Sequence, residues 1–152
     1  IESLYEPLIK KGATFFSTDR RGAEMIKYAS NAFLATKISY INEIANLCES
    51  LGADVHDVAK AMGKDGRISD KFLHPGPGFG GSCFPKDTKA LTVTGDFYKT
   101  NLSIIKSVIK SNEKRRSLWM AYNMLDKIRG HLQTIMESGK LAQKDLELLN
   151  KS

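Results

Sequence analysis

The chain has 152 residues, 41% hydrophobic and 26% charged, a composition that fits a folded domain and excludes a disordered chain. No apolar stretch approaches the roughly 18 residues that a membrane-spanning helix needs, and the first residues lack the pattern of a secretory signal. The formal net charge of +6 admits an anionic partner, whether nucleic acid, a membrane surface or a phosphate-bearing small molecule. Cys48 and Cys83 are too few for a disulfide framework, so we expect a reducing, cytoplasmic compartment.

The chain begins with Ile1 rather than methionine, and we therefore expect a processed product or a piece of a longer protein. Residues 1–11 have apolar side chains at helical spacing and predict a short helix that Gly12 ends. Residues 13–17 (Ala-Thr-Phe-Phe-Ser) give the one convincing strand pattern. Because a lone strand has no partner, we expect it to be the edge of a sheet whose remainder lies upstream.

Residues 21–51 predict a helix of about 30 residues, since apolar side chains recur at three- and four-residue steps. The helix is apolar on more than one side, which predicts burial against two surfaces, its own domain and a second copy in a homodimer. Gly52 ends this helix. Asp54 caps a shorter helix over residues 55–62, and a polar loop follows over residues 63–70.

The second half of the chain is also predicted to be helical. A helix is predicted over residues 85–94 and is broken by Gly95. A long helix then runs from Asn101 or Ser103 to about Arg129, where Gly130 interrupts it, and a loosely attached final helix covers residues 131–152. The predicted fold is therefore mainly α, built around two long helices, with a stub of an upstream α/β domain.

Residues 74–82 contain glycine or proline at six positions and predict a shaped loop. The loop contains G-x-G-x-x-G at Gly76, Gly78 and Gly81, which is formally the dinucleotide-binding fingerprint. That interpretation fails on context, because no strand precedes the glycines and no βαβ unit surrounds them. The better interpretation is a loop whose bare backbone lets a ligand approach closely.

Cys83 stands just before a predicted helix start, with Pro85 in the first turn and Asp87 at a position where a carboxylate meets free backbone N–H groups. A thiolate at a helix N-terminus, beside the cation of Lys86, is stabilised and is a better nucleophile. The competing interpretation is a small buried side chain, the commoner fate of a free cysteine. The flanking glycines and the helix start favour a reactive Cys83, whereas Cys48, inside the first long helix, is predicted to be core.

Lys27 and Asn31 lie four residues apart and share one face of that helix. Spacing alone favours a solvated surface pair, but on a helix buried on several sides an inward Lys and Asn would need a purpose. The three histidines and two cysteines match no metal-ligand spacing, so no metal site is predicted. The basic run at residues 114–116 lacks interleaved aromatic residues and is predicted to be a solvated helix face rather than a nucleic-acid patch.

Two segments, residues 23–35 (Ala-Glu-Met-Ile-Lys-Tyr-Ala-Ser-Asn-Ala-Phe-Leu-Ala) and residues 78–87 (Gly-Phe-Gly-Gly-Ser-Cys-Phe-Pro-Lys-Asp), closely resemble the UDP-glucose/GDP-mannose dehydrogenase family. The resemblance runs from about Leu4 to about Arg129 and covers the family's central helical domain. It divides the chain into three parts: residues 1–20, the end of an N-terminal Rossmann domain; residues 21–130, the central dimerisation and catalytic domain; and residues 131–152, a C-terminal helical tail unlike the family's usual continuation.

The resemblance implies an enzyme of polysaccharide precursor synthesis that oxidises UDP-glucose to UDP-glucuronate in two NAD-dependent steps. Cys83 would attack the intermediate aldehyde, giving a thiohemiacetal and, after the second oxidation, a thioester. Asp87 would activate the water that releases the product. Lys27 and Asn31 would stabilise negative charge that develops on the C6 oxygen.

The resemblance also implies which residues bind substrate and cofactor. Arg67 would reach the substrate of the neighbouring subunit, and Lys86 would lie near NAD. A loop would wrap the sugar and diphosphate through Phe72, Leu73, His74, Pro75, Gly76 and Gly80. The family's N-terminal Rossmann domain and C-terminal UDP-binding domain have no counterpart in this sequence, so we expect the chain to be inactive alone.

An alternative interpretation is a stand-alone helical dimerisation or ligand-binding module without catalysis. It predicts that this chain is the whole product and starts at its own methionine, and the first residue, Ile1, argues against it. A nucleic-acid binder is a third and weaker interpretation, which would require DNA affinity that falls with salt.

Overall fold

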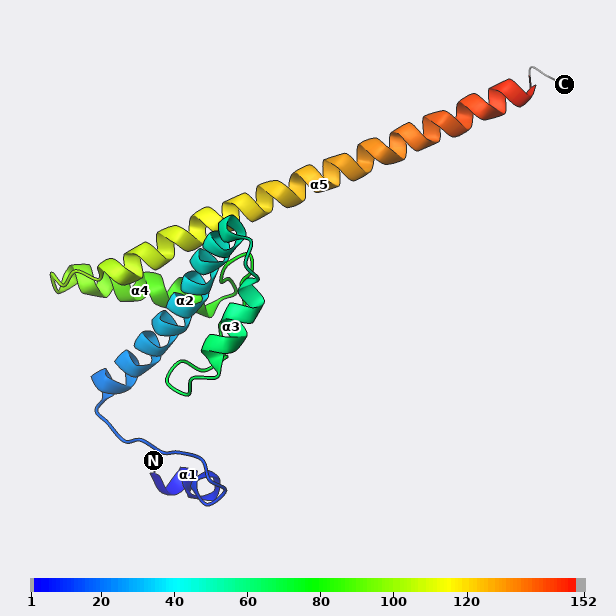
Figure 1. Ribbon diagram of the computed structural model, residues 1–152. Helices are drawn as coiled ribbons and strands as arrows, with labels where there is room; N and C mark the ends of the chain where they lie inside the picture. Colours follow the sequence, from blue (N-terminus) through cyan, green and yellow to red (C-terminus); the bar gives the residue numbers. More distant parts are fainter. Residues whose placement is uncertain (1, 150–152) are drawn as a thin grey trace.

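The computed structural model describes residues 2–149, and the mainly α prediction is confirmed. Within those residues there are five helices and no strand (Figure 1): α1 (Glu2–Ile9), α2 (Arg20–Leu51), α3 (Val55–Gly63), α4 (Cys83–Phe97) and α5 (Ser103–Leu149). The two long helices, α2 and α5, are those that the sequence predicts. None of the helices in residues 2–149 combines the length and apolarity needed to cross a membrane.

The bounds of α2 follow from its caps. Asp19 stands at the N-cap, where its carboxylate accepts a hydrogen bond of 2.6 Å from the backbone N–H of Gly22. Gly52 stands at the C-cap with φ 70°, the left-handed conformation that favours glycine. The predicted end of this helix at Gly52 is therefore confirmed.

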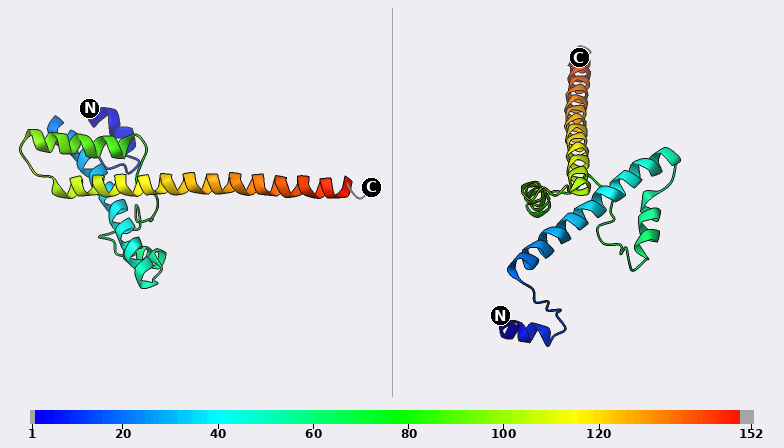
Figure 2. Two further views of the ribbon diagram at one scale, coloured as in Figure 1. Left: turned by 90° about the horizontal axis from the view of Figure 1, so that it is seen from above. Right: turned by 90° about the vertical axis from the view of Figure 1, so that its left-hand side faces the viewer.

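The strand predicted over residues 13–17 is not formed, since these residues have no regular secondary structure and pair with no segment of the described chain. A strand needs a hydrogen-bonding partner, and the described residues offer none. The Tyr5 and Phe15 rings approach each other at 6.2 Å between centroids, while α1 buries no residue and contacts no other helix (Figures 1 and 2). Residues 2–19 thus form an arm outside the helical core. Residue 1, with which the predicted first helix begins, lies outside the described residues.

The core forms where α2 packs against α3, α4 and α5. One cluster joins Ala35 of α2 to Phe79 of the glycine loop and Val108 of α5. A second cluster joins Ile41 of α2 to Ala59 of α3 and Leu73 of the preceding loop, and Cys48 of α2 is buried as predicted. The loop is therefore fixed at both ends by buried side chains.

The predicted helix break at Gly95 is wrong, since α4 continues to Phe97. A Cβ atom at Gly95 would lie 2.8 Å from Cδ1 of Leu102 and 3.0 Å from the carbonyl oxygen of Thr100. The glycine thus permits close packing of the turn that leads into α5 rather than ending the helix.

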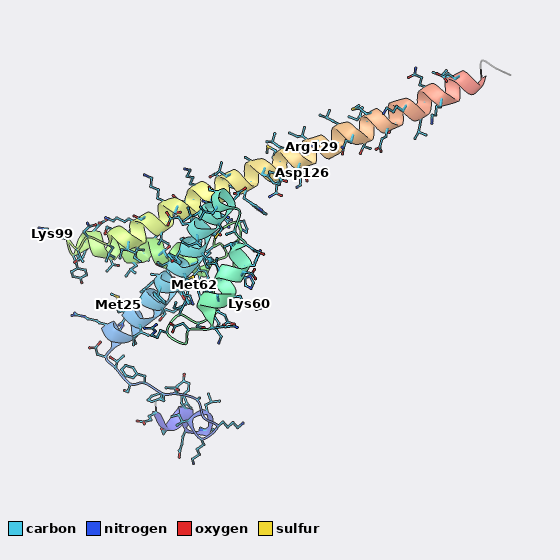
Figure 3. The ribbon with its side chains drawn as sticks, viewed as in Figure 1. Met25, Lys60, Met62, Lys99, Asp126 and Arg129 are labelled. Carbon is cyan, nitrogen blue, oxygen red and sulfur yellow. The ribbon has the colours of Figure 1, made fainter. Side chains whose placement is uncertain are left out.

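The predicted interruption at Gly130 is also wrong, because α5 runs unbroken over 47 residues, about 70 Å. One exposed glycine weakens a helix by only about 1 kcal/mol, and its neighbours sustain the hydrogen-bond ladder. The second half of α5 projects from the other helices (Figure 2), and Figure 3 shows Asp126 and Arg129 on this projecting part. The predicted final helix is thus a continuation of α5, with residues 150–152 outside the description.

Candidate active site

Cys83 is the first residue of α4, and its side chain is exposed. Ser82 precedes it at the N-cap without forming a side-chain capping hydrogen bond, and its Oγ lies 3.8 Å from the Cys83 Sγ. The first backbone N–H groups of a helix have no intrahelical partner, and they stabilise negative charge nearby. The position predicted for the nucleophile therefore combines solvent access with the positive end of a helix.

One helical turn later, Asp87 lies on the same face of α4 as Cys83. Asp87 is only 4% exposed, and its Oδ2 accepts a 2.5 Å hydrogen bond from Nδ2 of Asn31. The Nζ of Lys27 lies 3.6 Å from the same oxygen, and the Lys27 side chain remains 61% exposed. Three predicted catalytic residues from α2 and α4 thus meet around one buried carboxylate.

The solvated-pair interpretation of Lys27 and Asn31 is wrong for Asn31, which is 9% exposed. A buried carboxylate without partners is costly, and the amide and ammonium supply them to Asp87. Each donor retains further N–H groups, since an amide carries two and an ammonium three. The cluster can therefore also donate to an oxygen atom of a ligand.

The glycine loop is held by Asn112 of α5. Its Oδ1 accepts from the backbone N–H of Phe79 at 2.7 Å, and its Nδ2 donates to the Phe79 carbonyl at 3.0 Å. Gly78, at φ 98°, lies so close that a Cβ there would clash with the Asn112 Oδ1. The loop therefore needs glycine at 78 both for its backbone conformation and for its contact with α5.

Two arginines of the basic run also hold this loop, so the prediction of a solvated face is wrong for them. Arg115 donates to the carbonyl of Gly76 and, at 3.1 Å, to the Asn46 side chain. Arg116 donates to the Phe79 carbonyl at 3.4 Å. Residues 112, 115 and 116 share one helix face, and this spacing was the available signal for the role that sequence reasoning missed.

Asn42 of α2 is another loop contact that the sequence did not indicate. Its side-chain oxygen accepts from the backbone N–H of Gly76 at 2.8 Å. The two neighbours of the loop, α2 and α5, therefore both bind its backbone, and the loop enters α4 from a fixed position.

The predicted substrate loop is partly core. Leu73 is 3% exposed, so only its backbone could contact a ligand, while Phe72 packs edge-on against Phe84 with ring centroids 6.0 Å apart. His74 is exposed, and Pro75, Gly76 and Gly80 are half-buried. A hollow of about 320 Å³ lies between α3 and this loop; its lining residues are His56, Ala59, Lys60, Asp70, Leu73 and His74.

Arg67 lies on the surface, away from the cluster around Asp87. Its guanidinium binds Asp65 at 2.6 Å, and no contact joins it to Cys83, Lys27 or Asn31 in the described residues. The side-chain hydrogen bond from Arg67 holds the pKa of the Asp65 carboxyl below its usual value and raises the pKa of Arg67. Arg67 is thus directed outward.

Lys86 is exposed in the first turn of α4. Across residues 2–149, no three His, Cys, Asp or Glu side chains gather closely enough to hold a metal ion. The site therefore consists of an exposed thiol, a buried carboxylate with two donors, and a glycine loop anchored on both sides.

The helical fold and the motif around Cys83 are those of the central domain of a nucleotide-sugar dehydrogenase. The chain belongs to the UDP-glucose/GDP-mannose dehydrogenase family, whose central-domain sequence model matches residues 21–114. It is 52% identical over 128 residues to UDP-glucose 6-dehydrogenase of Rickettsia felis, covering 84% of this chain and 28% of that protein.

Two further relatives agree. The chain is 49% identical over 132 residues to UDP-glucose 6-dehydrogenase YwqF of Bacillus subtilis, covering 86% of this chain and 29% of the relative. A UDP-glucose dehydrogenase structure from Pyrobaculum islandicum superposes with a TM-score of 0.62 at 46% identity, covering 64% of this chain and 22% of the other. The chain thus spans under a third of the length of these relatives.

Proposed function

We propose that this chain is the central domain of a UDP-glucose 6-dehydrogenase and supplies its nucleophile, Cys83. The observation that carries the proposal is the placement of an exposed thiol at the start of α4, one turn from the buried Asp87 that binds Lys27 and Asn31. A thiolate at a helix N-terminus suits attack on a carbonyl carbon near neutral pH.

In the proposed step, the Cys83 sulfur attacks the C6 aldehyde of the oxidised sugar. A carbon–sulfur bond forms while the carbonyl electron pair moves to the oxygen, which gains negative charge. The free N–H groups of Lys27 and Asn31 donate to that oxygen and stabilise it. Protonation of the oxygen gives the thiohemiacetal, and its oxidation gives a thioester that water, activated by Asp87, hydrolyses to the carboxylate.

NAD accepts hydride in such oxidations. The described residues do not fit a complete NAD site, since residues 2–149 contain no βαβ unit and Lys86 stands exposed on a helical surface. We therefore expect the chain to work beside a Rossmann domain that holds NAD and a C-terminal domain that holds the UDP end of the substrate.

The proposed enzyme is a homodimer through α2. Phe33, Tyr40 and Leu47 follow one another at seven-residue intervals on α2, and they are 65%, 46% and 55% exposed. Covering this apolar stripe with the same stripe of a second copy would bury it. The outward Arg67 is then available to the substrate of the neighbouring subunit.

The test is a chimera in which residues 21–114 of this chain replace the matching segment of YwqF from Bacillus subtilis. We expect NADH to form when UDP-glucose and NAD are added, whereas this chain alone should form none. Cys83→Ser in the chimera should abolish the signal, and Cys48→Ser, at a buried position, should retain it. A folded chimera without activity would refute the proposal and favour a binding module without catalysis.

A simpler measurement examines the thiol in this chain. Cys83 is exposed and Cys48 is 6% exposed, so iodoacetamide should label Cys83 at least about tenfold faster. Mass spectrometry of peptides taken over time gives both rates. Equally slow labelling of the two cysteines would remove the case for an activated nucleophile.

A further inference from the structure

The second half of α5 carries an apolar pattern that the central-domain match, which ends at residue 114, does not cover. From residue 118 on, small or apolar residues recur at alternating steps of three and four over 32 residues. We call these positions the α5 seam: Leu118, Ala121, Leu125, Ile128, Leu132, Ile135, Gly139, Ala142, Leu146 and Leu149. This is the heptad pattern of a coiled coil, in which one helix packs along another.

The seam residues from Leu118 to Leu146 are all exposed. Leu118, Leu125 and Ile135 are 62%, 66% and 67% exposed, and the far part of α5 projects away from α2 and α4 (Figures 1 and 2). A period of 3.5 residues keeps one stripe facing a partner helix of the same period over many turns. A globular core or a sheet would not require that period, so the partner is a long helix.

We propose that the α5 seam binds the same seam of a second copy of this chain, with the two helices antiparallel. The seven Leu or Ile residues and three small residues of the seam determine the direction. When Leu132 faces Ile135 of the partner, every small residue faces a large one: Ala121 faces Leu146, Leu125 faces Ala142, and Ile128 faces Gly139. Alternating large and small side chains fills such an interface evenly.

A parallel pair packs less well. Equivalent residues would then meet, so Gly139 would face Gly139 and Ala142 would face Ala142 in the next layer. These adjacent layers would leave a gap between helices that the flanking Leu and Ile layers hold apart. The antiparallel register closes that gap.

Charge also permits self-pairing. Residues 118–149 carry four Lys or Arg and four Asp or Glu, so two copies meet without net repulsion although the whole chain has a charge of +6. The seam segment spans about 48 Å, and an antiparallel pair places the two folded cores at opposite ends of it. The projection of α5 away from the other helices leaves room for this arrangement (Figure 2).

The experiment is disulfide trapping in full-length chain that carries Cys83→Ser, so that only introduced thiols react; Cys48 is buried. An Ala121→Cys variant with an affinity tag is mixed with an untagged Leu146→Cys variant and oxidised. We expect the tagged and untagged chains to link at least ten times faster than either variant links to itself. The two positions are about 38 Å apart along one helix, so a parallel pair cannot join them.

Two further variants show whether the link forms through the seam. Ile135→Glu, in both chains, places a carboxylate in the central layer and should slow the mixed link at least tenfold. Leu141→Glu, at an exposed position outside the seam, should leave it unchanged. Links of each variant to itself, no mixed link, or equal effects of the two glutamates would each overturn the proposal. The chemistry of Cys83 does not enter this test, so its outcome is separate from that of the proposed function.

Discussion

Replacing Asn112 with alanine tests whether one side chain of α5 holds the glycine loop ahead of Cys83. The Asn112 amide is 7% exposed and forms both hydrogen bonds with the backbone of Phe79, at 2.7 and 3.0 Å. In Asn112→Ala the Phe79 N–H loses its acceptor, while the Phe79 carbonyl keeps Arg116 as a donor at 3.4 Å. The variant therefore measures the free energy lost when two hydrogen bonds are removed and one buried N–H group is left without an acceptor.

The expected loss follows from these contacts. Each hydrogen bond contributes about 1 kcal/mol, and an unsatisfied buried donor costs about 1–3 kcal/mol. Since the carbonyl keeps a partner, we expect the free energy of unfolding to fall by about 2–4 kcal/mol. With a urea slope of about 2 kcal/mol per molar, the midpoint of unfolding should fall by about 1–2 M.

The assay is urea unfolding followed by far-ultraviolet circular dichroism. The matched control is Asn123→Ala on the same helix, whose amide donates only to the Trp119 carbonyl one turn earlier at 2.9 Å. That carbonyl lies within the α5 ladder, so the control should change stability by less than about 0.5 kcal/mol. If Asn112→Ala unfolds at the same urea concentration as the control, the inference that Asn112 holds the loop is wrong.

Three further predictions follow from other contacts. Gly78→Ala should lower the free energy of unfolding by more than about 2 kcal/mol because of its positive φ and the Asn112 contact, whereas Gly130→Ala, with nothing within 4 Å, should raise it by about 0.5–1 kcal/mol; equal urea midpoints would contradict this. Arg67→Ala should raise the pKa of Asp65 toward 3.8 in an NMR titration, because the hydrogen bond from Arg67 lowers it in the folded chain. The pair therefore stabilises the fold at pH values above 3.8, and this stabilisation is lost as the pH falls through the folded pKa of Asp65. An unchanged titration would count against the pair. Sedimentation at micromolar concentration of a chain that carries Ile135→Glu, which disables the α5 seam, should show a homodimer, weakened by Leu47→Glu on α2, and a monodisperse monomer would refute the association expected through α2.

The helix bounds that the sequence predicted correctly are those set by local chemistry. Gly52 and Asp54 each act through atoms within a few residues, so their effect can be inferred without the fold. Gly95 and Gly130 were misjudged because a glycine permits a helix to continue where packing or neighbouring turns support it. Its effect depends on surroundings that the sequence does not display.

The candidate site divides in the same way. Cys83 and Asp87 could be placed together from their spacing on one helix, but the link from Asp87 to Asn31 spans 56 positions and exists only in the folded chain. The anchoring of the loop by Arg115 and Arg116 was missed for the same reason, since their spacing shows that they share a helix face but not which backbone acceptors that face meets in a distant loop.

The anchors that α5 supplies to the glycine loop all lie in its first third, and α5 continues far beyond them as one helix. Such a rod acts as a lever. If it pivots at its first residue, the tip moves about four times as far sideways as the anchors, since it is about 70 Å away and they are about 15–20 Å away. A force on the far end of α5 is therefore multiplied at the loop, and whatever holds that end steady also holds the residues that lead into Cys83.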